Sequence, residues 1–280
     1  MREIEVSAIT EAVRDLCIEA NHELAPDMKA ALEKAAETEE SALGKQILSQ
    51  LEKNLQIAKD DTIPICQDTG MAVFFVELGQ EVHITGGSLE DAINKGVHRG
   101  YTEGFLRKSV VSDPIERVNT KDNTPAVIHY SVVPGDSLKL TIAPKGFGSE
   151  NMSRVFMLKP ADGIEGVKNA ILTAVKDAGP NACPPMVVGV GIGGTFEKCA
   201  ILAKKALTRP VGEHSEIPYV KELEEEMLQR INETGIGPGG LGGTTTALAV
   251  NVLTYPTHIA GLPVGINICC HVNRHASRVL

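Results

Sequence analysis

Hydrophobic residues recur at helical spacing over the first 60 residues of the chain. The first such set consists of Ile9, Val13, Leu16, Cys17 and Ala20. Residues spaced three or four apart lie on one face of a helix, so this set predicts an amphipathic helix. A second helix is expected from Pro26 to Glu37, because proline is favoured in the first helical turn. A third, longer amphipathic pattern ends near Asp60, so the pattern predicts a helical region over residues 1–60.

Beyond residue 63 the pattern changes to short apolar runs between turn signals. Residues 71–78 indicate a buried strand, and the β-rich runs 126–133 and 137–143 are joined by Pro-Gly-Asp, which predicts a hairpin. Further strands are expected at 186–190, 246–252 and 264–269, and helices at 89–104, 163–178, 195–207 and 219–231. We therefore expect an α+β (mixed α/β) fold, with the helical region followed by a mixed sheet and packed helices, in a single domain over residues 1–280.

Composition narrows the functional classes. The 280 residues are 42% hydrophobic, which is enough for a large buried core. The formal net charge of −9 and the absence of a Lys/Arg-rich run disfavour binding to nucleic acid or to an anionic membrane. The first ten residues lack the layout of a signal peptide, and no apolar run approaches the ~18 residues that span a bilayer. We expect a cytoplasmic protein without nucleic-acid or membrane partners.

Six cysteines are the most informative residues. Cys17 and Cys199 fall on apolar helix faces and are expected in the core. Cys66, Cys183 and Cys270 fall in segments expected to be loops, and no C-x-x-C pair is present. This spacing is unlike a zinc ribbon or a ferredoxin-type cluster site. It leaves two interpretations open: scattered buried cysteines, or three distant thiolates that hold a four-iron cluster with one open iron.

Several other motifs are ambiguous on their own. Residues 189–194 match G-x-G-x-x-G, but no strand with a terminal acidic residue follows, so a tight turn is favoured over a dinucleotide site. The stretch 235–246 is the densest in glycine and is expected to form a loop that folds tightly near a cofactor. Arg107 is compatible with a solvated surface position or with anion binding. The single histidines His258 and His271 are each compatible with a structural or a functional role.

The motifs taken together resemble one family, because many of them occur in one order. They are CQDTG, LRKSVV, DNTPA, KGFGSENMS, GPNACPP, GIGGT, GGLGGTTTAL, YPTHIAGLPVGIN and, near the end, CH followed by RH. From about residue 40 onward, this order is similar to the alpha subunits of class I fumarases and L(+)-tartrate dehydratases. Phe147 departs from the glycine expected at its position.

The resemblance implies an oxygen-sensitive [4Fe-4S] cluster with Cys66, Cys183 and Cys270 as ligands. Cys270 is chosen over its neighbour Cys269 because the family's cysteine immediately precedes a histidine. The resemblance further implies that substrate is bound by the residues matching the family's contacts, namely Gln67, Asp68, Arg107 and the backbone near Gly146 and Gly148. Asp68 is the candidate acid/base, and His258 is expected to orient a group or shuttle a proton.

The expected function is that of the alpha subunit of a hydro-lyase that reversibly hydrates fumarate to L-malate in the tricarboxylic acid cycle. The resemblance implies a separate beta subunit that supplies further arginines, a lysine and a threonine, in an expected (αβ)2 assembly. L(+)-tartrate dehydratase, which converts tartrate to oxaloacetate, is the alternative within the same class. A non-catalytic iron–sulfur redox or sensor protein and a dinucleotide-binding oxidoreductase are the alternatives outside it.

Overall fold

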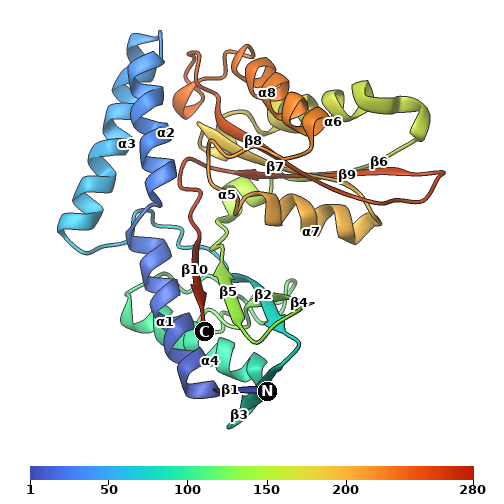
Figure 1. Cartoon of the computed structure of the whole chain (residues 1–280). Coiled ribbons are helices and arrows are strands. Elements are labelled where there is room, and N and C mark those ends of the chain that lie inside the picture. Colours follow the sequence, from blue (N-terminus) through green and yellow to red (C-terminus); the bar gives the residue numbers. More distant parts are fainter. The chain divides into compact units, whose positions relative to one another are not determined.

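The computed structural model describes residues 1–280, and their contacts divide the chain into two compact units (Figure 1). Unit 1 comprises residues 1–25, 55–146 and 274–280, and unit 2 comprises residues 26–54 and 147–273. The helical region 1–60 is therefore shared between them. Helices and mixed sheets occur in both units, which confirms the α+β class.

Unit 1 packs two helices against a four-stranded sheet (Figure 1). The helices are α1 (Val6–His22) and α4 (Leu89–Glu103), and the sheet order is β10 (Ala276–Val279), β5 (Leu138–Ile142), β2 (Val73–Gly79) and β4 (Val127–Val133). The two helices approach closely because α4 contributes Gly96 and Gly100 to the contact. A Cβ at either position would lie 2.6 Å from α1, at Val13 and Cys17 respectively. Cys17 is fully buried, as predicted.

The structure corrects two predictions in unit 1. The β-rich runs form strands β4 and β5, but these do not pair as a hairpin, because β2 lies between them, parallel to β4 and antiparallel to β5. The first four residues of the apolar strand β2 are buried, and its central position pairs both of its edges. The chain also starts with a strand, β1 (Arg2–Glu5), and not with a helix, because it pairs in parallel with β3 (Val82–Thr85).

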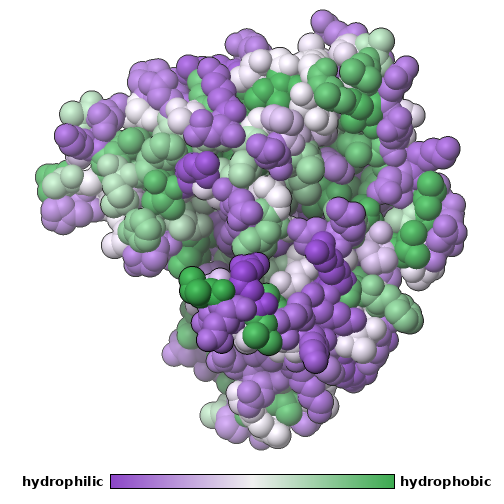
Figure 2. Space-filling view, turned by 180° about the vertical axis from the view of Figure 1, so that it is seen from behind, coloured by the Kyte–Doolittle hydropathy of each residue, from purple (hydrophilic) through white to green (hydrophobic).

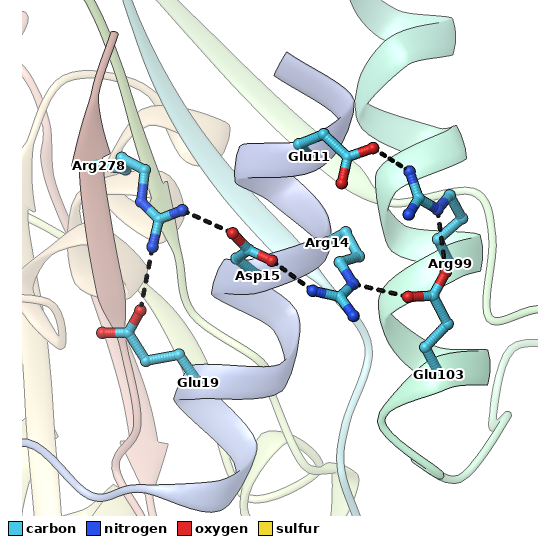
Figure 3. A network of polar contacts seen from close by, with 7 residues as sticks. All are labelled: Glu11, Arg14, Asp15, Glu19, Arg99, Glu103 and Arg278. Carbon is cyan, nitrogen blue, oxygen red and sulfur yellow. Dashed lines mark hydrogen bonds and ion pairs between the residues drawn. The ribbon is translucent and has the colours of Figure 1, made fainter. Parts of the chain in front are cut away.

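Ion pairs cross the outer face of unit 1 (Figure 3). Arg14 of α1 lies 2.7 Å from both Asp15 and Glu103, and Arg99 of α4 also binds Glu103 at 3.0 Å. On the other side Arg278 of β10 contacts Asp15 at 3.0 Å. Hydrogen bonds from the neighbouring arginines lower the pKa values of the Asp15 and Glu103 carboxyls. These exposed pairs link α1, α4 and the C-terminal strand, although each contributes little stability alone.

Unit 2 is a four-stranded sheet covered on both faces by helices (Figure 1). The strand order is β6 (Arg154–Leu158), β9 (Leu262–Cys269), β7 (Met186–Gly193) and β8 (Ala247–Tyr255). The helices α6 (Gly163–Ala178) and α8 (Pro218–Asn232) cover one face, and α7 (Phe196–Ala206) covers the other. The remaining helices are α2 (Pro26–Thr38), α5 (Phe147–Glu150) and the first part of α3 (Ala42–Asp60), with 3-10 turns η1 (Pro160–Asp162), η2 (Gly179–Ala182) and η3 (Pro238–Gly240).

The G-x-G-x-x-G match is explained by packing in unit 2. Gly189 and Gly191 lie within the buried strand β7, under helix α7. A Cβ at Gly189 would lie 2.1 Å from the carbonyl oxygen of Ala203, and one at Gly191 would lie 2.1 Å from that of Cys199. These glycines therefore allow close contact between strand and helix, and no space for a pyrophosphate remains above them. Cys199 itself is fully buried, as predicted.

On the face shown in Figure 2, hydrophilic and hydrophobic side chains alternate. The most exposed large hydrophobic side chains include Ile259 at 91%, Phe105 at 88% and Ile115 at 86%. None of the helices combines the length and the apolar character needed to span a bilayer.

Candidate functional site

The Cys66 loop, residues 64–70, connects α3 to β2 in unit 1. Buried side chains donate hydrogen bonds to its last carbonyl groups: the Tyr101 hydroxyl lies 3.0 Å from the carbonyl oxygens of both Thr69 and Gly70, and Asn123 Nδ2 lies 3.1 Å from that of Gly70. Gly70 has φ +77°, which L-residues rarely adopt, and its Cα faces the backbone of Lys145. The loop is thus held through its carbonyl groups.

Four of the predicted substrate-binding residues lie around this loop. Gln67 and Asp68 belong to it, with Gln67 exposed and Asp68 half-buried. The Thr69 hydroxyl donates to the carbonyl oxygen of Arg107 at 3.2 Å, and the Arg107 side chain is exposed. A Cβ built at Gly146 would lie 3.0 Å from Asp68 Oδ2, which places that glycine beside the carboxylate. Unit 1 therefore places the Asp68 carboxylate beside Gly146 and the backbone of Arg107 against Thr69, within the loop that contains Cys66.

Arg274 joins this group, although the sequence patterns did not single it out. Its side chain is 4% exposed, and its Nη2 donates to the carbonyl oxygen of Asp68. Its Nε and Nη1 are buried without a hydrogen-bond partner. A buried guanidinium with unused donors is costly, so its presence adds a positive charge where an anion would be stabilised. The RH motif near the C-terminus was the available signal for it.

The Cys183 turn, residues 179–185, contains the second predicted ligand and belongs to unit 2. Cys183 directly follows η2 within this turn and adopts a left-handed conformation with φ 52°. Its carbonyl oxygen accepts from the backbone N–H of His271 at 3.3 Å and from His271 Nδ1 at 3.0 Å. Because Cys270 immediately precedes His271, the structure brings these two predicted ligands into one neighbourhood.

The glycine-rich loop, residues 235–246, packs against the Cys183 turn. The N–H of Gly239 donates to the carbonyl oxygen of Pro184 at 2.9 Å. A Cβ at Gly240 would lie 2.3 Å from the Pro180 Cβ, so only glycine allows this contact. The prediction of a tightly folded loop is confirmed, and its position beside Cys183 gives the glycine density a physical reason.

Glu39, a residue that sequence reasoning missed, anchors the glycine-rich loop. It lies between α2 and α3 and is 1% exposed. Its carboxylate accepts backbone N–H bonds from Ser41 at 2.9 Å, from Thr244 at 2.9 and 3.1 Å and from Thr245 at 2.7 Å. Burial acts to raise the pKa of Glu39, but these bonds outweigh it and lower the pKa to about 2. In the sequence it is one acidic residue of a polar stretch, so no pattern could reveal it.

The other two predicted site residues, Gly148 and His258, lie in unit 2. Gly148 lies next to the Cys183 turn, because a Cβ built at Gly148 would lie 3.7 Å from the carbonyl oxygen of Asn181. His258 lies in the exposed turn between β8 and β9, whereas Cys270 follows the opposite end of β9. Within unit 2 the structure therefore brings Gly148, Cys183 and Cys270 together and separates them from His258.

The cysteines have chemistry that fits an iron–sulfur cluster. None of the six forms a disulfide. Cys66, Cys183 and Cys270 lie in loops, where Cys183 is exposed and the other two are half-buried, whereas Cys269 is the buried last residue of β9 at 4% exposure. Thiolates in loops are suitable cluster ligands. Cys66 belongs to unit 1 and the other two to unit 2, and neither unit by itself contains a group of three side chains that could hold a metal ion.

Comparison with known proteins decides the family. Residues 10–279 match the family model described as fumarate hydratase (Fumerase). The chain belongs to this family. The resemblance inferred from the motifs is thereby confirmed, and the family is one of hydro-lyases.

Named relatives agree with this membership. The chain is 41% identical over 274 residues to the "Putative L(+)-tartrate dehydratase subunit alpha" of Methanocaldococcus jannaschii, covering 96% of each chain. It is 30% identical over 276 residues to the "L(+)-tartrate dehydratase subunit alpha" of Escherichia coli K12, covering 97% of this chain and 90% of the relative. The chain thus spans nearly the full length of proteins that are named as alpha subunits.

Proposed function

We propose that this chain is the alpha subunit of a [4Fe-4S]-dependent hydro-lyase that acts on a four-carbon dicarboxylate in complex with a beta subunit. Reversible hydration of fumarate to L-malate is the leading reaction. The observation that carries the proposal is the match to the fumarate hydratase family over residues 10–279. The grouping of Asp68, Arg107 and Gly146 beside Cys66 supports it, because these groups can bind a carboxylate and move a proton.

The named relatives favour a second candidate substrate. Both the archaeal and the bacterial relatives are called L(+)-tartrate dehydratase subunits. Tartrate differs from malate by one hydroxyl group, so both substrates require the same binding of two carboxylates and the same removal of water. Dehydration of L(+)-tartrate to oxaloacetate is therefore the alternative reaction for the same site.

The proposed roles follow from the chemistry of each side chain. Cys66, Cys183 and Cys270 hold the cluster, which supplies a Lewis acid when bound. Arg107 binds a substrate carboxylate through charge-assisted hydrogen bonds, aided by Gln67 and by backbone N–H groups near Gly146 and Gly148. Asp68 exchanges the proton on the carbon next to the hydroxyl-bearing one. His258 orients the reacting groups.

The test is anaerobic co-expression with a beta subunit, followed by assays on malate, fumarate and L(+)-tartrate. We expect about four iron atoms per chain, turnover of at least one of these substrates, and loss of iron and activity in air. Cys183→Ser and Cys270→Ser should abolish both, whereas the matched control Cys269→Ser should retain iron. A Cys183→Ser protein with wild-type iron content and turnover would refute the assignment, and a stable cluster in air without turnover would favour a redox or sensor protein.

A further inference from the structure

Residues 110–120 form a closed loop on the surface of unit 1, between α4 and β4. Within the loop, the backbone N–H of Ser112 donates to the carbonyl oxygen of Val118 at 2.7 Å. At its base, the N–H of Thr120 donates to the carbonyl oxygen of Val110 at 3.0 Å. Every residue of the loop after Val110 is exposed or half-buried. The 110–120 loop is therefore held by its own backbone hydrogen bonds and not by burial in the core.

A buried side chain ties the base of the 110–120 loop to the Cys66 loop. Asn123 is fully buried; its Nδ2 donates to the carbonyl oxygen of Gly70 at 3.1 Å, and its Oδ1 accepts from the N–H of Ser109 at 2.7 Å. Arg107 lies two residues before Ser109 in the chain. A protein that binds the 110–120 loop is therefore positioned beside the side chains proposed to bind substrate.

The apex of the 110–120 loop presents apolar side chains to solvent. Ile115 is 86% exposed and Val118 is 60% exposed. The Asp113 carboxylate accepts from the backbone N–H groups of Ile115 and of the next residue at 2.7 Å each, so the apex has a fixed shape. Exposed apolar groups on a rigid element are typical of a contact surface with another protein.

Phe105, which follows α4 closely, is a second exposed apolar residue on the same segment. Its φ of +54° is common for glycine at the end of a helix but uncommon for a bulky residue. Its side chain is 88% exposed, so packing within the chain does not offset the unfavourable backbone conformation. A phenylalanine at this position is thus unfavourable for the chain alone, which indicates that another protein covers its ring.

The charge of the segment 105–121 is opposite in sign to that of the whole chain. The segment contains four basic residues and two acidic ones, whereas the chain has a formal net charge of −9. Arg107, Arg117 and Lys121 are exposed, and none of them forms an ion pair. Exposed apolar groups among unpaired cations fit a partner that offers an apolar groove with carboxylates at its rim.

We propose that Phe105 and the 110–120 loop are the docking surface for the beta subunit. An apolar groove of that subunit covers the exposed apolar side chains, and carboxylates at its rim meet the cations. The inference rests on the function proposed above, in which a beta subunit completes the substrate site. The beta subunit is the occupant because this surface continues into Arg107 and the Cys66 loop, where that subunit must reach.

The test is anaerobic turnover measured as a function of beta-subunit concentration. Ile115→Glu places a carboxylate in the acidic-rimmed groove, so the concentration for half-maximal turnover should rise at least about tenfold. Maximal turnover should stay at the wild-type level, because the side chain takes no part in the chemistry. Val132→Glu is the matched control, because Val132 is 71% exposed on β4 of the same unit, and it should keep the wild-type midpoint.

The cations are tested separately. Arg117→Glu should raise the same midpoint by about tenfold at low salt, and the difference from wild type should shrink as the salt concentration increases. Lys95→Glu is its control, because Lys95 is also an exposed lysine of unit 1, on α4. An Arg117→Glu variant that binds the beta subunit as tightly as wild type at low salt would overturn the role of the cations.

Docking can be measured without activity. A tagged beta subunit should retain wild-type and Val132→Glu chains during washing and should lose Ile115→Glu chains. Retention of Ile115→Glu at the wild-type level, or a loss of contacts between alpha chains alone in light scattering, would overturn the proposal and leave the proposed function intact. A wild-type complex that forms as expected but turns over none of the dicarboxylates would refute the proposed function, while the docking surface would stand.

Discussion

The Cys66 loop and the Cys183 turn present the same chemical group but are held by opposite means. In unit 1, neutral side chains of Tyr101 and Asn123 donate hydrogen bonds to the carbonyl groups of the Cys66 loop. In unit 2, the Glu39 carboxylate accepts from the N–H groups of the glycine-rich loop, which in turn packs on the Cys183 turn. The Cys66 loop is stabilised directly by neutral side chains, whereas the Cys183 turn is stabilised by a charged side chain that acts through the glycine-rich loop.

This difference determines how each support can fail. Removal of a neutral donor side chain costs the Cys66 loop one or two hydrogen bonds. Acid hardly changes this support, because the donor does not titrate at low pH. A buried carboxylate satisfies several N–H groups at once, and all of them lose their acceptor if it is removed or neutralised. The Cys183 side should therefore be the more sensitive of the two to single substitutions and to low pH.

Glu39→Ala should have the largest effect. It leaves the N–H groups of Ser41, Thr244 and Thr245 without their acceptor in a buried place, so we expect a loss of about 3–5 kcal/mol in the free energy of unfolding. Urea denaturation measures the loss, and hydrogen exchange should locate it in the glycine-rich loop. Glu40→Ala is the control, because that side chain is exposed. Equal stability of the two variants would show that the Glu39 contacts contribute nothing.

The two units should respond to opposite extremes of pH. The pKa of Glu39 falls from 4.5 to about 2 on folding, so its contribution of roughly 3 kcal/mol is present above pH 4.5 and is lost as the pH falls toward 2. Burial raises the pKa of Tyr101 above its ordinary value of 10.0 and that of Cys17 above 9.0. The buried neutral hydroxyl of Tyr101 and thiol of Cys17 therefore contribute to the free energy of unfolding below pH 10.0 and pH 9.0 respectively. This contribution is lost as the pH rises above those values.

Hydrogen exchange across pH measures this contrast. Amides near Thr244 and Thr245 should lose protection first in acid, and those near Gly70 first in alkali, after correction for the intrinsic pH dependence of exchange. Loss of protection in both regions at the same pH would contradict the comparison.

Tyr101→Phe should have the smallest effect of the three. It keeps the ring in the core and removes only the hydroxyl that donates to Thr69 and Gly70, so we expect a loss of about 1–2 kcal/mol, with exchange increased in the Cys66 loop. Tyr130→Phe is a suitable control, because Tyr130 is 47% exposed. A loss as large as that of Glu39→Ala would remove the distinction between the two supports.

The sequence predicted local structure better than strand pairing. The three N-terminal helices and three strands of unit 2 (β7, β8 and β9) are confirmed, because their hydrophobic period is a local property of the chain, whereas the edge strand β6 was missed. The expected hairpin of residues 126–143 is wrong, since Pro-Gly-Asp allows a turn but cannot show that β2 enters between the two strands. The first strand was missed for a similar reason, because four residues pair only once β3 is in place.

The sequence by itself determined the family, the order of the motifs and the loop positions of the three candidate cysteines, because these are properties of residues along the chain. Only the tertiary structure revealed that Arg274 lies against Asp68, that Glu39 holds the glycine-rich loop and that His258 is separated from Cys270 by the length of β9. The physical reason is that burial, hydrogen-bond partners and distance arise from contacts between residues far apart in sequence, which a local pattern does not encode.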